Sequence, residues 1–350
     1  MRSLSAKAIC FIMMISLCCF SAGCDSRPDN VKTENSTEED LVVVGFSQVG
    51  SESYWRNVNT ESMKSVFTKE NGYRLIFEDA QQKQTNQITA IRSFIQREVD
   101  YIVLAPVTET GWDTVLTEAK EAGIPVIIVD RKVDVSDDSL FTCWVGSDFE
   151  LEGMLVCMWM SKFFDLKGID PGDVHIADIQ GTLGSSAQLG RTKGFDYMAD
   201  LHGWDVVGYA EGEFTRSKGR EAMSEILRKN DDVNVVYCEN DSEALGAIEV
   251  LEAAGKKCGS DIAGGEVMIV CFDGISEEVR ACVANGKISC IGECNPLHGP
   301  RVASIIRSLE AGDEPEKYQY VTEGIFSDTS EIEKVMISGQ ERTVTVIRQP

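Results

Sequence analysis

Runs of consecutive apolar, often β-branched residues alternate along this chain with segments whose apolar residues recur every three or four positions. The first pattern predicts strands that are buried on both faces, and the second predicts amphipathic helices. In the first half, strands are predicted at residues 41–46, 74–77, 101–105, 126–129 and 141–145, with helices between them. Strands joined through helices form right-handed crossovers, so we expect a mostly parallel sheet.

The same alternation then starts again after an acidic loop. A long helix at residues 148–164 precedes strands predicted at 174–179, 206–209, 233–238, 267–272 and 288–291. The chain of 350 residues is also too long for one ordinary domain. The fold class predicted is therefore α/β, with two doubly wound parallel-sheet lobes facing one another.

The first strand ends in a turn that carries several hydrogen-bonding side chains. Ser47, Gln48, Ser51 and Glu52 lie in it, and the helix predicted to begin near Ser53 opens with Tyr54, Trp55 and Arg56. In open α/β sheets, ligands bind outside the carboxyl ends of the strands. Polar groups would bond sugar hydroxyls, an aromatic face would cover C–H surface, and arginine offers a rigid donor fork. The alternative for Trp55 alone is an ordinary core position.

Charged and amide side chains directly follow other predicted strands. They are Asp130, Arg131, Asn240, Asp273 and Glu293. Each acid or amide taken alone is explained by helix capping, but an arginine directly after Asp130 is not. Asp and Asn suit sugar recognition, because one carboxylate can accept hydrogen bonds from two neighbouring hydroxyls.

The N-terminus has the pattern of an export signal. Arg2 and Lys7 precede an apolar run at residues 8–20, which is too short to span a membrane comfortably. The sequence Ser21-Ala22-Gly23-Cys24 resembles a bacterial lipobox, although that pattern usually has Leu where Ser21 stands. We therefore predict a lipoprotein-type signal peptide at 1–23, lipidation of Cys24 and a flexible polar tether at 24–40. The protein would be exported and lipid-anchored to the cell membrane, on its extracellular or periplasmic face.

The net charge of the chain argues against one class of partner. The formal net charge is −24, whereas nucleic-acid binding needs basic surface.

The cysteines do not indicate a metal site. Twelve cysteines are present, but four lie at or before Cys24. Several of the other eight lie in apolar segments, where cysteine serves as a small buried hydrophobe. Cys290, Cys294 and His298 do not have zinc-finger spacing, so we predict no metal and no cofactor.

From about residue 41 to its end, the chain resembles type I periplasmic sugar-binding proteins, the solute receptors of ABC importers. Within that family it is most similar to galactofuranose-binding proteins. The matching segments are residues 46–53, 81–84, 86–88, 105–107, 110–112, 130–131, 151–153, 180–182, 191 with 193–195, and 214–219. The resemblance implies discontinuous lobes joined by a three-strand hinge. One lobe would hold residues 41–146 with about 294–320, and the other 147–293 with about 321–350.

The resemblance also implies roles for the matching residues. The first lobe would offer Glu52, Ser53, Tyr54, Trp55, Arg56, Asp130 and Arg131, and the second Arg191, Phe214, Asn240 and Asp273. Tyr54 or Trp55 would stack on one face of the sugar and Phe214 on the other, and Glu293 is a further candidate. The chain departs from galactofuranose-binding proteins at Tyr54, where they have glycine, and in the segment 293–300.

The function implied is capture of a monosaccharide by hinge closure and its delivery to an ABC-type permease. The sugar would be galactofuranose-like, or another hexose or pentose, and the protein would be a monomer without catalysis. One alternative is a subunit that senses a sugar and signals to a membrane receptor or kinase. A sugar-active enzyme would use converging carboxylates. A transcription regulator would need a helix-turn-helix where the signal segment stands.

Overall fold

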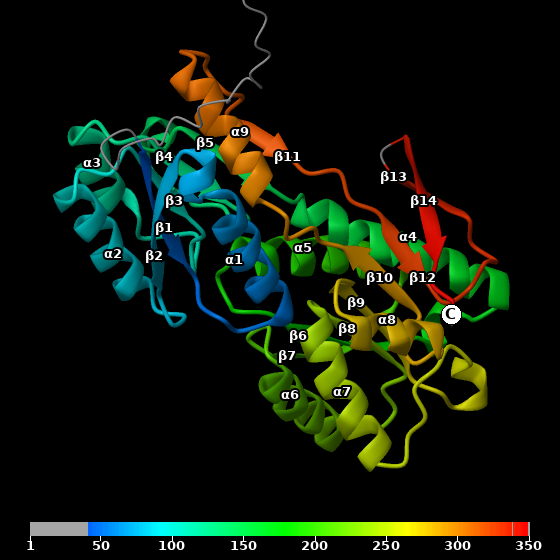
Figure 1. The fold of residues 1–350 in the computed structure, drawn as a ribbon. Coiled ribbons are helices and arrows are strands. Elements are labelled where there is room, and N and C mark those ends of the chain that lie inside the picture. Colours follow the sequence, from blue (N-terminus) through cyan, green and yellow to red (C-terminus); the bar gives the residue numbers. More distant parts are fainter. Residues whose placement is uncertain (1–40, 338, 349–350) are drawn as a thin grey trace, which may run out of the picture.

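The computed structural model describes residues 41–337 and 339–348, so the predicted signal peptide, Cys24 and the tether lie outside the described residues. Two α/β lobes stand side by side, each built on one sheet with helices on both faces (Figure 1). This arrangement confirms the predicted fold class.

The first sheet is parallel throughout and has six strands. In spatial order they are β11 (Tyr318–Tyr320), β5 (Cys143–Gly146), β4 (Val126–Val129), β3 (Tyr101–Leu104), β1 (Val42–Gln48) and β2 (Tyr73–Asp79). Its helices are α1 (Tyr54–Val66), α2 (Gln84–Gln96), α3 (Asp113–Glu121) and α9 (Gly299–Glu310).

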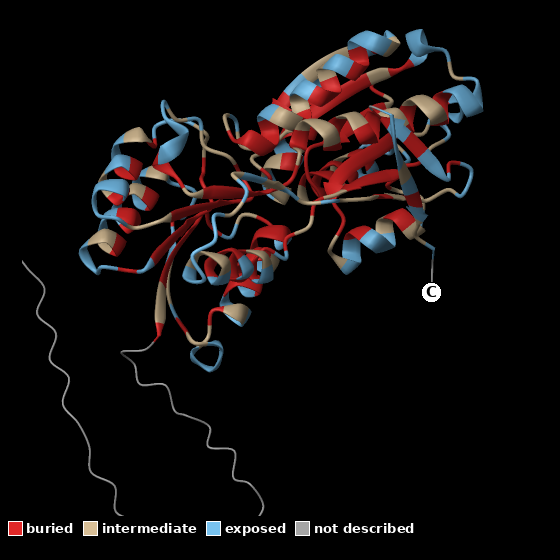
Figure 2. Ribbon diagram, turned by 90° about the horizontal axis from the view of Figure 1, so that it is seen from above, coloured by how far each residue is buried: buried red, intermediate tan, exposed pale blue. Residues whose placement is uncertain are grey.

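Both faces of this sheet are buried, which explains the uninterrupted apolar runs in the sequence. In β3, Tyr101 and Val103 join one core with residues of α1 and α9. Ile102 and Leu104 point the other way and pack with α2 and α3. Figure 2 shows the buried strands between helices whose outer faces are exposed.

The second sheet has eight strands. In spatial order they are β13 (Lys334–Ile337), β14 (Gln340–Val346), β12 (Ile325–Ser327), β10 (Cys290–Glu293), β9 (Met268–Asp273), β8 (Val235–Cys238), β6 (His175–Gln180) and β7 (Asp205–Glu211). Strands β10, β9, β8, β6 and β7 are parallel, whereas β10–β12 and β13–β14 are antiparallel pairs.

The helices of the second lobe cover this sheet on two sides. One core contains residues of α4 (Phe149–Lys167) and α5 (Ser186–His202), and the other contains residues of α6 (Arg216–Lys229), α7 (Asp241–Ala253) and α8 (Glu277–Ala284). The sequence patterns predicted the parallel strands, but they did not predict α8 or the C-terminal strands. Helix α8 and strands β11, β12 and β13 are short, and β14 is mostly polar.

Three segments connect the two sheets: one between β5 and α4, one between β10 and α9, and one between β11 and β12. The strands before and after the third segment belong to different sheets. We call these segments the first, second and third crossover.

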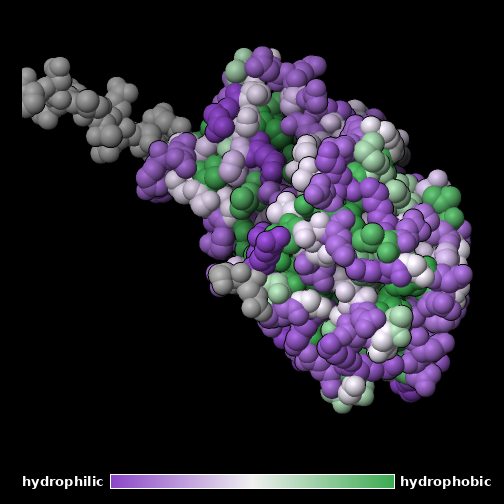
Figure 3. All heavy atoms as spheres, turned by 90° about the vertical axis from the view of Figure 1, so that its right-hand side faces the viewer, coloured by the Kyte–Doolittle hydropathy of each residue, from purple (hydrophilic) through white to green (hydrophobic). Residues whose placement is uncertain are grey.

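The surface of the second lobe is mostly hydrophilic on the face shown in Figure 3, where apolar residues form small separate groups. Such scattered apolar residues are ordinary for a surface in water. Among the described helices, none combines the length and the apolar character that crossing a membrane requires.

Helices α4 and α5 can approach closely because Gly153 of α4 has no side chain. A Cβ atom at Gly153 would lie 2.7 Å from the Arg191 carbonyl oxygen and 3.1 Å from the Tyr237 hydroxyl. Helix propensity alone would make Gly153→Ala stabilising by about 1 kcal/mol. We expect the overpacking to outweigh this gain and to lower the free energy of unfolding by about 1–2 kcal/mol, measured by urea denaturation.

The matched control is Gly208→Ala in β7. A Cβ atom there would meet nothing nearer than 3.6 Å, so stability should change by less than about 0.5 kcal/mol. Equal stability of the Gly153 variant and the parent would mean that the two helices can move apart freely.

Candidate functional site

A cavity lies between the lobes. Its lining comes from both lobes: Glu52, Ser53, Trp55, Arg56, Asp130 and Arg131 from the first, Phe149, Ala187, Arg191, Phe214, Asn240 and Asp273 from the second, and Cys294 from the second crossover. The cavity therefore suits one small molecule held by two lobes.

Strand ends and helix starts position these side chains. Ser53 is the N-cap of α1 and accepts a hydrogen bond from the Arg56 amide at 3.1 Å, so Trp55 and Arg56 lie on the first helical turn. Asn240 is the N-cap of α7, which is the role that the sequence predicts for an asparagine directly after a strand. Asp273 is the last residue of β9. The lining thus gathers where parallel strands end, which is the usual ligand position in this class of sheet.

Three lining residues have a left-handed backbone although none is glycine. The φ angles are 64° at Asp130, 58° at Phe214 and 82° at Asp273. Such conformations are costly, most of all for a bulky residue, and they concentrate at ligand-binding and catalytic sites. Here the backbone turns sharply at three points to face the cavity.

The first lobe contributes a buried cluster of two arginines and two carboxylates. Arg56 pairs with Glu52 at 2.9 Å and with Asp130 at 2.8 Å, while Arg131 lies 3.6 Å from Glu52. Burial by itself would lower the pKa of Arg56, but Asp130 and Glu52 raise it above its ordinary value. Burial and the neighbouring Arg56 lower the pKa of Arg131 to about 10. Both arginines remain charged at neutral pH.

Arg131 keeps donor capacity in this cluster. Its Nη1 donates to the Val107 carbonyl oxygen at 3.0 Å, and its guanidinium carbon lies 5.2 Å from the centre of the Phe214 ring. Its Nε is buried and has no hydrogen-bond partner among the described residues, and the same holds for Oε2 of Glu52. A buried donor or acceptor left unpaired is costly. A ligand with hydroxyl groups could satisfy such atoms.

The second lobe places Arg191 among three acceptors. Its Nε and Nη2 both lie 2.8 Å from Oε2 of Glu152, its Nη1 donates to the Glu239 carbonyl oxygen, and Asp273 lies 3.6 Å away. Burial would lower the pKa of Arg191, but Glu152 beside it holds the pKa well above its ordinary value. Burial, helped by the nearby Asp241, raises the pKa of Asp273.

Aromatic side chains form the apolar part of the lining. Trp55, Phe149, Ala187, Phe214 and Cys294 make a small apolar cluster of their own. The Trp55 ring is fixed because its Nε1 donates to the Cys294 carbonyl oxygen at 2.7 Å. Flat apolar walls with a few oriented polar groups are characteristic of small-molecule sites.

Ten of the twelve residues predicted for the site line this cavity, and two do not. Tyr54 is 52% exposed, because neighbouring residues on a helix point about 100° apart and Trp55 faces inward. Glu293 accepts a hydrogen bond from the Gly324 amide at 2.9 Å, so its carboxylate joins β10 to the third crossover.

Sequence reasoning missed Phe149, Ala187 and Cys294. Phe149 was treated as part of a helical pattern, although its position at the start of α4, just after a crossover, was a usable signal. Ala187 gives no chemical signal. Cys294 was considered only with Cys290 and His298, whereas its thiol lies within 4.8 Å of carboxylate oxygens of Glu152 and Glu323.

The rim of the cavity holds the two lobes together. The Lys132 amide donates to the Ser186 hydroxyl at 2.7 Å, and the Glu109 amide donates to the Gly184 carbonyl oxygen at 3.0 Å. Each bond joins a loop of the first lobe to the segment after β6. These two hydrogen bonds join the lobes close to the lining residues Arg131 and Ala187.

Comparison with known proteins agrees with this geometry. Residues 44–297 match the family model described as a periplasmic binding protein domain. The chain is 39% identical over 281 residues to the galactofuranose-binding protein YtfQ of Escherichia coli, and the match covers 79% of this chain and 85% of that protein.

Solved structures give the same result. A Mycobacterium smegmatis protein in complex with β-D-fucofuranose superposes with a TM-score of 0.77 at 39% identity, covering 82% of this chain and 92% of the other. The binding component of the arabinose ABC transporter from Shewanella sp. ANA-3, bound to L-arabinofuranose, gives a TM-score of 0.75 at 40% identity, with the same coverage.

The charge cluster of the first lobe gives the second prediction. Asp130→Asn keeps the size of the side chain and tolerates a positive φ, but it removes one of the two carboxylates that neutralise Arg56 and Arg131. Breaking a buried ion pair typically costs about 3–5 kcal/mol. Since Glu52 remains, we expect a loss of about 3 kcal/mol in ligand-free protein, measured by denaturant unfolding.

Asp313→Asn is the control for this change, because Asp313 is exposed in the turn after α9. It should leave stability within about 0.5 kcal/mol of the parent. If Asp130→Asn behaved like this control, the carboxylate would not be needed to balance the buried arginines.

Proposed function

The chain belongs to the periplasmic binding protein family, and on that premise we propose that it binds one monosaccharide between its lobes and delivers it to an ABC-type permease. The observation that carries this proposal is the cavity itself. It combines three buried arginines with the carboxylates of Glu52, Asp130 and Asp273 and with two aromatic walls.

A sugar matches both halves of this lining. Its hydroxyls are donors and acceptors, which the free Nε of Arg131 and the Asn240 amide could bond. Its C–H faces are apolar and would lie against Trp55 on one side and Phe214 on the other. Because both lobes contribute, closing them around the ring would desolvate these bonds, and a missing hydroxyl would then be costly.

We further infer that the sugar is bound in a five-membered ring. The E. coli relative is named for galactofuranose, and the two similar structures hold β-D-fucofuranose and L-arabinofuranose. These ligands share the furanose ring but differ in the groups attached to it. The exposed position of Tyr54 supports this inference, because the residue that replaces the family's glycine does not narrow the cavity.

The ion pairs of Glu52 and Asp130 favour binding without catalysis. A glycosidase needs one carboxyl group to protonate the leaving group and a second to act as nucleophile or base. Here Glu52 and Asp130 are both held by Arg56.

The proposal extends to the arrangement and location of the chain. The sheet memberships of β11 and β12 support lobes of residues 41–146 with about 294–320, and 147–293 with about 321–350. Membership of a periplasmic binding protein family supports an extracytoplasmic location. Anchoring through a lipid on Cys24 and a monomeric state rest on the sequence and complete the proposal.

The experiment that tests the function is a thermal-shift screen of the chain from residue 40 onward. The panel contains galactose, L-arabinose, D-fucose, ribose, glucose and galactofuranose. A ligand at 100 times its dissociation constant adds about 2.7 kcal/mol to stability. We expect a clear rise in Tm with one or a few sugars that form furanose rings, and little with glucose. No shift with any member of the panel would contradict monosaccharide binding.

A further inference from the structure

Glu323, in the third crossover, touches the other two crossovers. It accepts a hydrogen bond from the Ser147 hydroxyl in the first crossover at 2.7 Å and from the Asn295 amide in the second at 2.6 Å. Both bonds end on the same oxygen, Oε1. One carboxyl group therefore ties together the three segments that connect the lobes.

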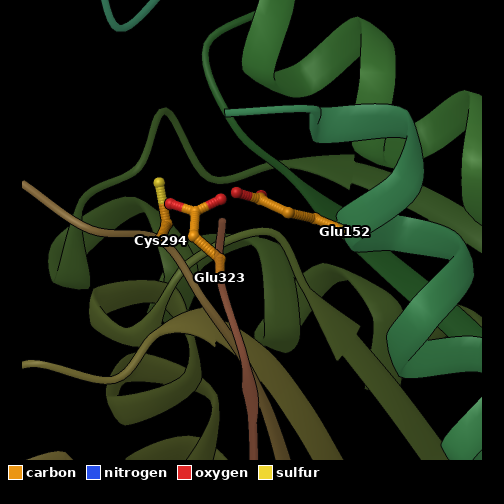
Figure 4. A group of neighbouring side chains, drawn as sticks. All are labelled: Glu152, Cys294 and Glu323. Atoms are coloured by element: carbon orange, nitrogen blue, oxygen red, sulfur yellow. The ribbon is translucent and has the colours of Figure 1, made fainter. Parts of the chain in front are cut away.

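Glu152 of α4 faces this group from the second lobe. Figure 4 shows the carboxyl groups of Glu152 and Glu323 pointing toward one another, with the Cys294 thiol beside Glu323. The ligand-type atoms of the three residues lie within 4.8 Å of one another. Glu152 is only 4% exposed, and its Oε1 has no hydrogen-bond partner among the described residues. Its Oε2 accepts a hydrogen bond from Nε of Arg191 and forms an ion pair with Nη2 of the same guanidinium.

Charged groups of both signs surround this pair. Arg191 pairs with Glu152, and Asp273 lies on the far side of Arg191. Arg301 of α9 and Arg342 of β14 lie on the side of Glu323, where Arg301 donates to the Asn295 side chain and the Leu297 carbonyl oxygen. Asp148 lines one pocket together with both glutamates, and the Glu293 carboxylate bonds to the Gly324 amide next to Glu323. The Cys294 thiol is also close, and burial raises its pKa well above its ordinary value, so it stays neutral.

Two carboxylates held this close cannot both ionise cheaply, and one shared proton resolves the conflict. Burial raises the pKa of Glu152, and burial together with the Glu152 charge raises that of the half-buried Glu323. A proton shared between the two carboxyl groups removes most of the repulsion between them. A proton on Glu323 would also give the unpaired Oε1 of Glu152 its missing donor.

We propose that Glu323 and Glu152 share one proton and act as a positioning pair, which holds Arg191 at the cavity and the three crossovers in register. The part of this inference that concerns ligand affinity rests on the proposed function. When the proton is lost, repulsion between the two carboxylates pushes Glu323 away from Ser147 and Asn295. The same repulsion disturbs the Glu152 carboxylate that orients Arg191. Hinge geometry and ligand affinity then change together.

The first test uses sugar-free protein and compares the parent with Glu323→Gln. The amide keeps an oxygen acceptor for Ser147 and Asn295 and donates an N–H to Glu152, so it copies the protonated state at every pH. The unfolded chain releases the proton near the ordinary carboxyl value of 4.5. The folded parent holds it to higher pH, so its stability falls as pH rises above that value.

We therefore expect the Tm of Glu323→Gln to rise relative to the parent between pH 5 and 9, by about 2 °C per pH unit until the folded pair itself deprotonates. Glu314 is exposed in the loop before β11, and the Tm of Glu314→Gln should change with pH as the Tm of the parent does. A difference between Glu323→Gln and the parent that does not change with pH would overturn the shared proton. This result stands whether or not a sugar binds.

The second test measures the dissociation constant of the sugar found in the thermal-shift screen at pH 7 and pH 9.5, with and without EDTA. We expect the parent to weaken by about tenfold on going to pH 9.5 and Glu323→Gln to change by less than about threefold. Glu323→Ala, which lacks both acceptor and donor, should bind more weakly than either at both pH values.

Two results would overturn the positioning role. One is the same loss of affinity at pH 9.5 in the parent and in Glu323→Gln. The other is an affinity or a Tm that falls with EDTA and returns with Zn²⁺, because the Glu152, Cys294 and Glu323 atoms would then hold a metal ion in place of a proton.

Discussion

The need to neutralise buried charge determines the structure around the cavity. Arg56, Arg131 and Arg191 are each at most 3% exposed. A buried guanidinium is stable only beside opposite charge and with its N–H groups bonded. The first lobe meets this need with Glu52 and Asp130, and the second with Glu152 and Asp273. Strand ends with strained φ angles hold two of these four carboxylates in place.

The same constraint links the cavity to the hinge. Arg191 lies at the cavity, its partner Glu152 lies behind it, and Glu323 beyond that bonds to the first and second crossovers. A chain of charged and hydrogen-bonded groups thus runs from the ligand position to the segments that must bend when lobes open. Beside the cavity, the amides of Lys132 and Glu109 bond to the opposite lobe, and Trp55 packs with Phe149, Ala187 and Phe214 of the second lobe. Opening would break both the hydrogen bonds and these apolar contacts.

The sequence was most informative where local chemistry is strong. Continuous apolar runs predicted the parallel strands, because both faces of each sheet are covered, and Ser53 predicted the start of α1. Asp130 and Arg131 were found because an arginine after a strand has no simple capping role. The short helix α8, the C-terminal strands and the pair Glu152–Glu323 were not found. Partners 171 residues apart in the chain come together only through the crossovers, and no local pattern encodes that meeting.

The most direct test of sugar binding between the lobes is a calorimetric titration of the parent and Arg131→Ala with the stabilising sugar, with the exposed Arg92→Ala as control. We predict one site per chain, unchanged affinity in the control and at least a tenfold loss in Arg131→Ala, since a charged hydrogen bond in a closed site is worth about 1.5–3 kcal/mol. Equal affinity in the parent and Arg131→Ala, with both folded, would show that the sugar binds elsewhere.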